Sequence, residues 1–102
     1  MISLLRQHHD SIAQLCHRYG VARLEVFGSA SDGTEFDPAR SDVDLLVEFK
    51  QPPGNNFDAY FDLKFALEKL LNRPVDLVEE GAATNPYFLR RLNESRQPLY
   101  GT

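Results

Sequence analysis

The fold is decided by Val26-Phe27-Gly28-Ser29 together with a second run, Asp42-Val43-Asp44-Leu45, that follows residues 30–41. An apolar run ends abruptly at Gly28-Ser29, and two aspartates one residue apart open a second apolar run. In a strand, residues i and i+2 point to the same face, so Asp42 and Asp44 project together. Two like charges so near each other repel unless a cation lies between them. The pattern therefore predicts a cation site where the second strand begins.

Oxygen ligands of this kind suit Mg²⁺, which usually takes one or two carboxylates and completes its shell with water and substrate phosphates. Gly28 allows close backbone approach, and Ser29 would begin a helix or turn whose free N–H groups can hold an anion. Taken alone, Gly-Ser is usually a turn and Asp-x-Asp is more often a cap or a solvated loop. The combination, in the order strand, Gly-Ser, loop, Ser41-Asp42-x-Asp44, strand, predicts a phosphate-plus-metal site.

This pattern resembles the nucleotidyltransferase signature, in the form found in minimal nucleotidyltransferases (MNT), the antitoxin component of HEPN–MNT toxin–antitoxin systems. The likeness continues in residues 73–78, which resemble the third-aspartate strand of that family, and in residues 85–87 and 95–100, which resemble its C-terminal segment. It covers roughly residues 20–100. The resemblance implies an α/β fold with a small mixed β-sheet, packed helices and a polymerase-β-like nucleotidyltransferase core.

The resemblance also implies a reaction and a site. The expected reaction moves AMP from ATP to a tyrosine of a cognate HEPN RNase toxin, needs Mg²⁺ (two ions) and releases pyrophosphate. The family pattern assigns catalysis and metal binding to Asp42, Asp44 and Asp76, and nucleotide binding to Gly28 and Ser29. Ser41 is a further candidate for nucleotide binding, whose hydroxyl would bond a phosphate or, alternatively, the adjacent backbone. Asp76 lies in a run that otherwise reads as a buried strand, where an unpaired carboxylate is costly, so it should have a cation or donors. A structural salt bridge from Asp76, for example to Arg73, is the alternative.

Two other functions stay open at this point. A non-catalytic antitoxin would neutralise the toxin by binding, through Phe61, Phe65 and the C-terminal helix. A small-molecule nucleotidyltransferase would share this core, but such enzymes usually carry a further domain that holds the acceptor. The chain also departs from the family: many members have Ala-Arg where this sequence has Ser31-Asp32. An acid there would not help to bind a triphosphate, and Arg40 is one substitute.

Composition places the 102 residues in one domain, 1–102, with 42% hydrophobic and 25% charged residues, as in ordinary globular proteins. The net charge of −4 argues against stable nucleic-acid binding. The single cysteine, Cys16, is expected in the core and fits a reducing compartment. We see no signal peptide and no stretch long enough to span a membrane, so we expect a cytoplasmic protein that can form a hetero-oligomer with the toxin.

Periodicity predicts alternating helices and strands, which favours α/β architecture. The three histidines are spaced poorly for a metal, so we expect them to be solvated or half-buried. In the helix at 57–72, Phe61 and Phe65 widen the apolar arc, which indicates deep packing or, alternatively, a partner surface. The expected helices are 2–19, 30–32, 57–72 and 86–95, and the expected strands are 21–27, 42–49 and 75–78, with a short extended piece at 99–100.

Overall fold

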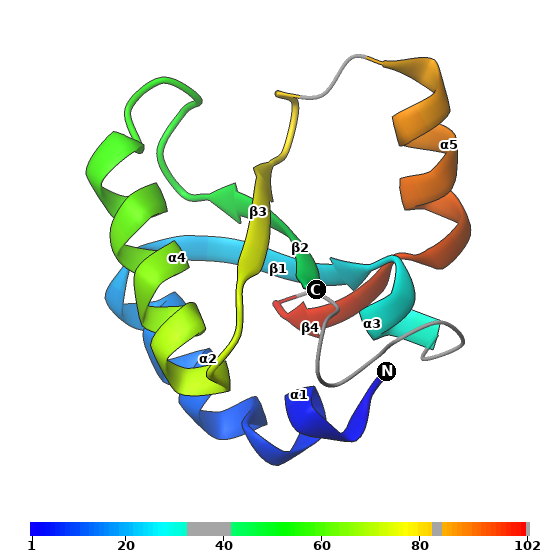
Figure 1. Cartoon of the computed structure of the whole chain (residues 1–102). Coiled ribbons are helices and arrows are strands. Elements are labelled where there is room, and N and C mark those ends of the chain that lie inside the picture. Colours follow the sequence, from blue (N-terminus) through cyan, green and yellow to red (C-terminus); the bar gives the residue numbers. More distant parts are fainter. Residues whose placement is uncertain (33–41, 83–84, 102) are drawn as a thin grey trace.

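The computed structural model describes residues 1–32, 42–82 and 85–101. Helices and strands alternate along most of that chain (Figure 1). The helices are α1 Ser3–Gln7, α2 His9–Arg18, α3 Ser29–Asp32, α4 Phe57–Leu71 and α5 Pro86–Ser95. The strands are β1 Val21–Phe27, β2 Val43–Phe49, β3 Val75–Glu79 and β4 Gln97–Tyr100.

In the described ranges the four strands form one mixed sheet in the order β3-β2-β1-β4. β1 pairs antiparallel with both β2 and β4, whereas β2 and β3 are parallel and are connected through α4. A parallel pair needs such a crossover, because the chain must return to the same end of the sheet. The α/β class and the mixed sheet expected from the sequence are confirmed.

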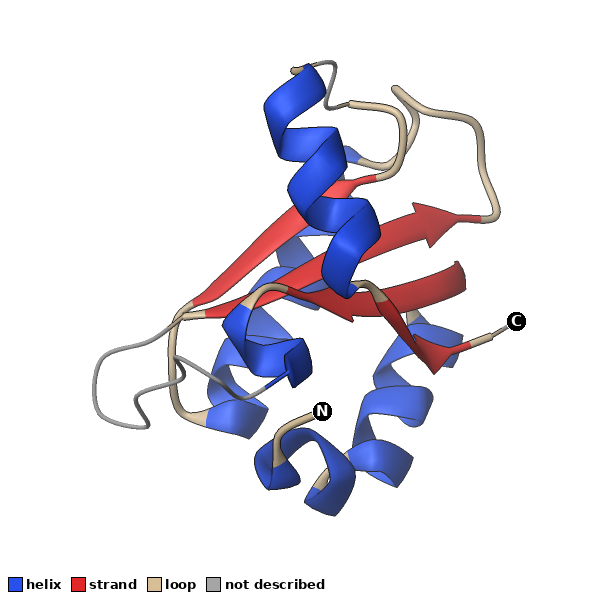
Figure 2. Ribbon diagram, turned by 90° about the vertical axis from the view of Figure 1, so that its right-hand side faces the viewer, coloured by secondary structure: helices blue, strands red, loops and turns tan. Residues whose placement is uncertain are grey.

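The two faces of the sheet are covered unequally. Helices α1, α2 and α4 lie on one side, and α5 alone crosses the other side (Figure 2). The covered face holds the main core, in which Leu24, Leu45 and Leu67 are fully buried. We call the opposite side the open face; a smaller cluster of Phe27, Leu46 and Leu92 lies there beneath α5. Strand residues therefore alternate between the main core and the open face.

Helix boundaries differ from expectation at the N-terminus. The helix expected at 2–19 is two helices, because His8 leaves helical geometry with φ −102° and ψ 15°. The buried side chains Leu5, Ile12 and Cys16 nevertheless keep their helical spacing and join the core, as expected. His8 is half-buried and His9 and His17 are exposed, which confirms the expectation for the histidines.

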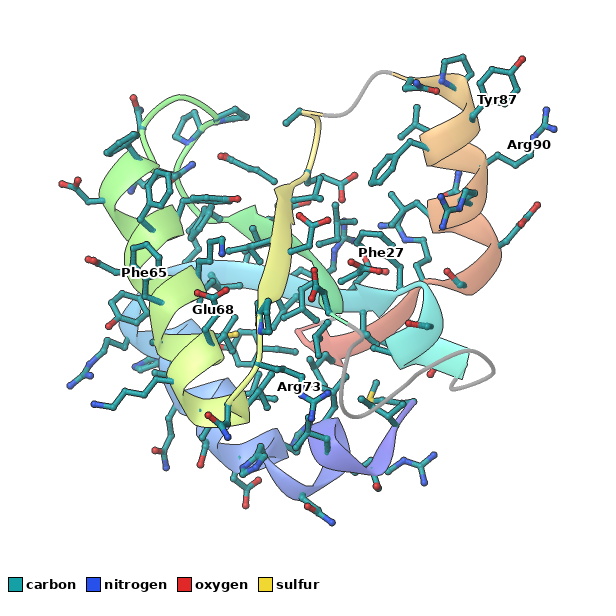
Figure 3. The ribbon with its side chains drawn as sticks, viewed as in Figure 1. Phe27, Phe65, Glu68, Arg73, Tyr87 and Arg90 are labelled. Carbon is teal, nitrogen blue, oxygen red and sulfur yellow. The ribbon has the colours of Figure 1, made fainter. Side chains whose placement is uncertain are left out.

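The prediction that α4 is packed deeply on all its apolar sides is wrong. Leu63 and Leu67 are fully buried, but Phe61 and Phe65 are 37% and 58% exposed. Figure 3 shows the Phe65 ring on the side of α4 away from the sheet. These rings contact one another, with a centroid separation of 6.0 Å between Phe61 and Phe65, and Phe61 also meets the Tyr60 ring edge-on at 5.0 Å. Among the described helices, none has the length and apolar character needed to cross a membrane.

Candidate active site

Two of the three aspartates lie side by side on neighbouring strands. In the ladder between β2 and β3, Asp44 is the direct partner of Asp76, and on its other side Asp44 pairs with Phe27 of β1. Because partners in a ladder share a face, the Asp44 and Asp76 side chains both belong to the open face. Spacing predicted that Asp42 and Asp44 project together, and the family resemblance implied that Asp76 joins them; the ladder between β2 and β3 places Asp76 directly beside Asp44.

Gly28 follows β1 and lies against Asp44. Its φ is +69°, and a Cβ built on it would lie 2.7 Å from Asp44 Oδ2. Only glycine adopts that backbone conformation without strain, and only glycine leaves room for the carboxylate. Gly28 therefore serves two purposes at once: it turns the chain into α3, and it lets the Asp44 carboxylate approach the loop.

Electrostatics at the site reflect the crowding of acids. Burial, followed by the charges of Asp76 and Asp42, raises the pKa of Asp44 to about 6, and the charge of Arg91 opposes this rise. Asp44 therefore lies within reach of the negative charges of both other aspartates. A carboxyl pKa raised by neighbouring acids is typical of groups that bind a cation or take part in proton transfer.

The remaining candidate residues are placed as follows. Asp42 is exposed and immediately precedes β2, whereas the sequence placed it inside the strand. Asp76 is exposed too, so the expected burial was wrong: β3 is an edge strand, and nothing among the described residues covers its open face at this point. Ser29 begins α3 and is half-buried. Ser41 and Arg40 lie outside the described residues.

The donor set fits a magnesium ion, although the described side chains do not enclose one. Within residues 1–32, 42–82 and 85–101, no three or more His, Cys, Asp or Glu side chains are arranged to hold a metal. Mg²⁺ asks less of a protein than this, since one or two carboxylates suffice when water and substrate phosphates supply the other oxygens. The adjacent Asp44 and Asp76, with Asp42 immediately before β2, meet that requirement.

Ser95 is a residue that the sequence interpretation missed. The Gly28 N–H donates to Ser95 Oγ (2.9 Å), the Ser95 hydroxyl donates to the Arg91 carbonyl (3.2 Å), and the Ser31 hydroxyl donates to the Ser95 carbonyl. The end of α5 is thereby joined to both ends of the turn that contains Gly28. A serine near the end of a helix gives no sequence signal for a contact with a residue so far away in the chain.

Two further contacts hold α5 against the sheet. The Phe88 ring meets Phe27 edge-on, with centroids 5.7 Å apart, and the Arg96 guanidinium donates two hydrogen bonds to Glu25, at 2.9 and 2.7 Å. Hydrogen bonding from Arg96 holds the pKa of Glu25 below its ordinary value, against the effect of burial. Because the pair is bidentate and charged, it fixes the direction in which the chain leaves α5 for β4.

Comparison with known proteins gives a consistent result. The pattern of the nucleotidyltransferase domain family matches residues 10–99. The chain is 34% identical over 91 residues to a Methanocaldococcus jannaschii protein with the provisional name protein adenylyltransferase, across 89% of this chain and 86% of that protein. It is 37% identical over 76 residues to protein adenylyltransferase MntA of Thermococcus cleftensis, across 74% of this chain and 70% of MntA.

Solved structures agree with this. One described provisionally as a minimal nucleotidyltransferase has a TM-score of 0.74 at 36% identity, covering 93% of this chain and 92% of that one. A crystal structure of a toxin–antitoxin with AMP-PNP has a TM-score of 0.70 at 26% identity, covering 92% of this chain and 73% of that one. With the Gly-Ser turn, the Asp-x-Asp strand and the third-aspartate strand on one sheet, the chain belongs to the nucleotidyltransferase domain family.

Proposed function

We propose that this chain is an antitoxin that transfers AMP from ATP to a tyrosine of a cognate HEPN RNase toxin. The observation that carries the proposal is the Asp44–Asp76 ladder pair facing the Gly28 turn, in a chain similar to an MntA adenylyltransferase and to a toxin–antitoxin structure with AMP-PNP. The AMP-PNP complex supports ATP as the substrate, and the toxin named in that complex supports a protein partner.

The carboxylates would organise the reaction. Asp42, Asp44 and Asp76 would hold Mg²⁺, which when bound supplies positive charge beside the phosphates and the incoming hydroxyl. Asp76, on the exposed edge strand, is accessible to a hydroxyl from another molecule and would help to orient that hydroxyl or accept its proton. Positioning and charge neutralisation do most of the work in phosphoryl chemistry of this kind.

The transfer itself forms one bond and breaks one bond. The tyrosine oxygen attacks the α-phosphorus of ATP, the bond between the α-phosphorus and the bridging oxygen to the β-phosphorus breaks, and pyrophosphate leaves with that oxygen. The hydroxyl proton passes to a carboxylate of the site or to solvent. The product is a tyrosine carrying AMP through a phosphodiester bond.

Gly28 and Ser29 would contribute to the nucleotide side, together with Ser41. In the structure the Gly28 N–H already donates to Ser95. We therefore assign Gly28 the role of close approach, in which the absent side chain leaves room for the Asp44 carboxylate and for a ligand above it. Ser29 would offer its hydroxyl and its backbone N–H at the beginning of α3.

The experiment is an intact-mass measurement on a HEPN RNase encoded beside this chain's gene. Incubation with the chain, ATP and Mg²⁺ should add mass to the toxin in steps of about 329 Da, one AMP each. Asp44→Asn and Asp76→Asn should abolish the gain, whereas the exposed Asp62→Asn on α4 should not. A stable complex that blocks the RNase without any mass gain would instead establish a binding antitoxin.

A further inference from the structure

Helix α5 presents two chemically different sides, and one of them faces the candidate active site. The spacing i, i+3, i+4, i+7 places four residues on one side of this helix: Phe88, Arg91, Leu92 and Ser95. Three of the four have contacts that fix this side against the sheet: Phe88 with Phe27, Leu92 at 3% exposure, and Ser95 with Gly28. Arg91 is therefore on the side of α5 that faces the open face.

The neighbouring arginine is on the outer side. Arg90 falls at helical spacing with Tyr87 and Glu94, and Figure 3 shows Tyr87 and Arg90 directed away from the sheet. Tyr87 is 76% exposed. Two adjacent arginines on one helix thus have opposite surroundings, which provides a matched control for any role of Arg91.

Arg91 lies on the side of α5 that faces the strands of the aspartates, and it forms no ion pair with them. Phe88, on the same side of α5, contacts Phe27, which pairs with Asp44 in the ladder between β1 and β2. Among the ion pairs of the described residues, all within 4.0 Å, none includes Arg91. Its side chain is exposed. Two other arginines on the open face already form ion pairs: Arg23 pairs with Glu25 and Glu48, and Arg96 pairs with Glu25. Arg91 thus keeps its five N–H donors available.

A nucleotide triphosphate needs such a cation. It brings several negative charges to a face that already carries Asp42, Asp44 and Asp76, and Asp32 ends the helix that follows the Gly-Ser turn. Arginine is the side chain best suited to phosphate, because its planar fork donates two parallel hydrogen bonds. The Ser95 hydroxyl donates to the Arg91 carbonyl and accepts from the Gly28 N–H. It therefore connects this part of α5 to the turn that contains Gly28.

We propose that Arg91, carried by α5 and held over the open face by Phe88, Leu92 and Ser95, binds the triphosphate of the nucleotide. This assignment rests on the proposed function and deepens it, by supplying from the last helix a cation that the Gly-Ser turn lacks. It assigns to α5 a part in nucleotide binding, in addition to any contact that its outer side makes with a partner.

The test compares Arg91→Ala, Arg91→Lys and Arg90→Ala in the absence of toxin. The ligand is an ATP analogue with a methylene group between the α- and β-phosphorus, which cannot be cleaved there, in the presence of Mg²⁺. Arg91→Ala should weaken binding about ten- to a hundredfold, the usual effect of losing charge-assisted hydrogen bonds. Arg91→Lys should lie in between, and Arg90→Ala should stay within about twofold of the unmodified chain.

Tripolyphosphate and adenosine separate a phosphate contact from a general disturbance. Arg91→Ala should weaken competition by tripolyphosphate and leave competition by adenosine unchanged, with the melting temperature preserved. Equal affinities in Arg91→Ala and Arg90→Ala, or an equal loss for both competitors, would overturn the assignment while leaving adenylyl transfer in place. If the unmodified chain binds no ATP analogue and transfers no AMP, the proposed function fails together with it.

Discussion

The Asp44 carboxylate lies so close to Gly28 that no side chain fits between them: a Cβ on Gly28 would be 2.7 Å from Asp44 Oδ2. Gly28→Ala must therefore displace the carboxylate, in addition to straining a backbone at φ +69°. Gly20 has the same φ of +69° with nothing within 4 Å of a built Cβ, so Gly20→Ala carries the strain alone. We expect each variant to lose about 1–2 kcal/mol of unfolding free energy from strain, measured by urea denaturation.

The two glycine variants should differ in activity. Gly28→Ala should lose transfer to the toxin at least tenfold beyond Gly20→Ala, because only the former moves a carboxylate of the site. Equal transfer rates in the two variants would show that the close approach of Gly28 and Asp44 has no part in the reaction.

Asp44→Asn should stabilise the chain in the absence of metal. Burial and the neighbouring acids raise the pKa of Asp44 to about 6, so the folded state disfavours the ionised form. This penalty appears as the pH rises from the ordinary carboxyl pKa to about 6, and it is complete above that value. The amide should therefore raise the unfolding free energy by about 1–2 kcal/mol near pH 8 and by little near pH 3.

Thermal unfolding with EDTA and then with Mg²⁺ checks this prediction. Magnesium should raise the melting temperature of the unmodified chain and have little effect on Asp44→Asn, because the amide is a poorer ligand. Asp62→Asn, at an exposed position of α4, serves as the control. A lower melting temperature for Asp44→Asn in EDTA would contradict the electrostatic account.

Glu25→Gln tests the link between α5 and the sheet. Hydrogen bonding from Arg96 lowers the pKa of Glu25, so its contribution to stability is present above the unfolded-state pKa and is lost as the pH falls through the folded-state value. We expect a loss of about 1–3 kcal/mol near pH 7 that shrinks toward acid pH. The measurement is chemical denaturation across that range, with the exposed Glu94→Gln as the comparison; a loss independent of pH would contradict the assignment.

Cys16 should be unreactive in the folded chain. It is fully buried, and burial raises the pKa of its thiol to about 12, so the nucleophilic thiolate is scarce at neutral pH. A disulfide exchange reagent should label it only after unfolding in denaturant. Rapid labelling without denaturant would show that α2 separates from the sheet readily.

Truncating a side chain to alanine should change the unfolding free energy by different amounts on the two sides of α4. Leu67 is fully buried, and Leu67→Ala should cost about 2–5 kcal/mol of unfolding free energy. Phe65 is 58% exposed, and Phe65→Ala should cost less than about 1 kcal/mol. Urea denaturation of both variants gives the comparison, and a large loss for Phe65→Ala would mean that the ring is covered in solution, for example by a second copy of the chain.

Local sequence patterns predicted most of the helices and strands, because hydrophobic periodicity and helix- or strand-breaking residues act within a few positions of the chain. Strand β1 and helix α5 have the expected bounds, and α4 ends at Leu71 where Asn72 adopts φ 54°. The break at His8 was missed, since the apolar spacing of Leu5, Ile12 and Cys16 continues across it. Such interruptions depend on how two short helices fit the sheet, which no local pattern encodes.

Motifs predicted the candidate residues of the site, whereas their surroundings could not be predicted from the sequence. Asp42 and Asp44 followed from their spacing, whereas the exposure of Asp76 follows from the position of β3 at the edge of the sheet. Ser95 reaches Gly28 across the fold, and the opposite surroundings of Arg90 and Arg91 depend on how α5 packs. Strand order and helix orientation are properties of the whole chain, so their consequences could not be found from motifs.

The pairing of β4 with β1 also sets a time order during synthesis. Residues 97–100 add to the edge of a strand made at the beginning of the chain, and Ser95 completes the hydrogen bonds of the Gly28 turn. At about 5–20 residues per second, Ser95 follows Asp76 by roughly 1–4 s. The Gly28 turn therefore reaches its final hydrogen bonding last, although its own residues are translated early.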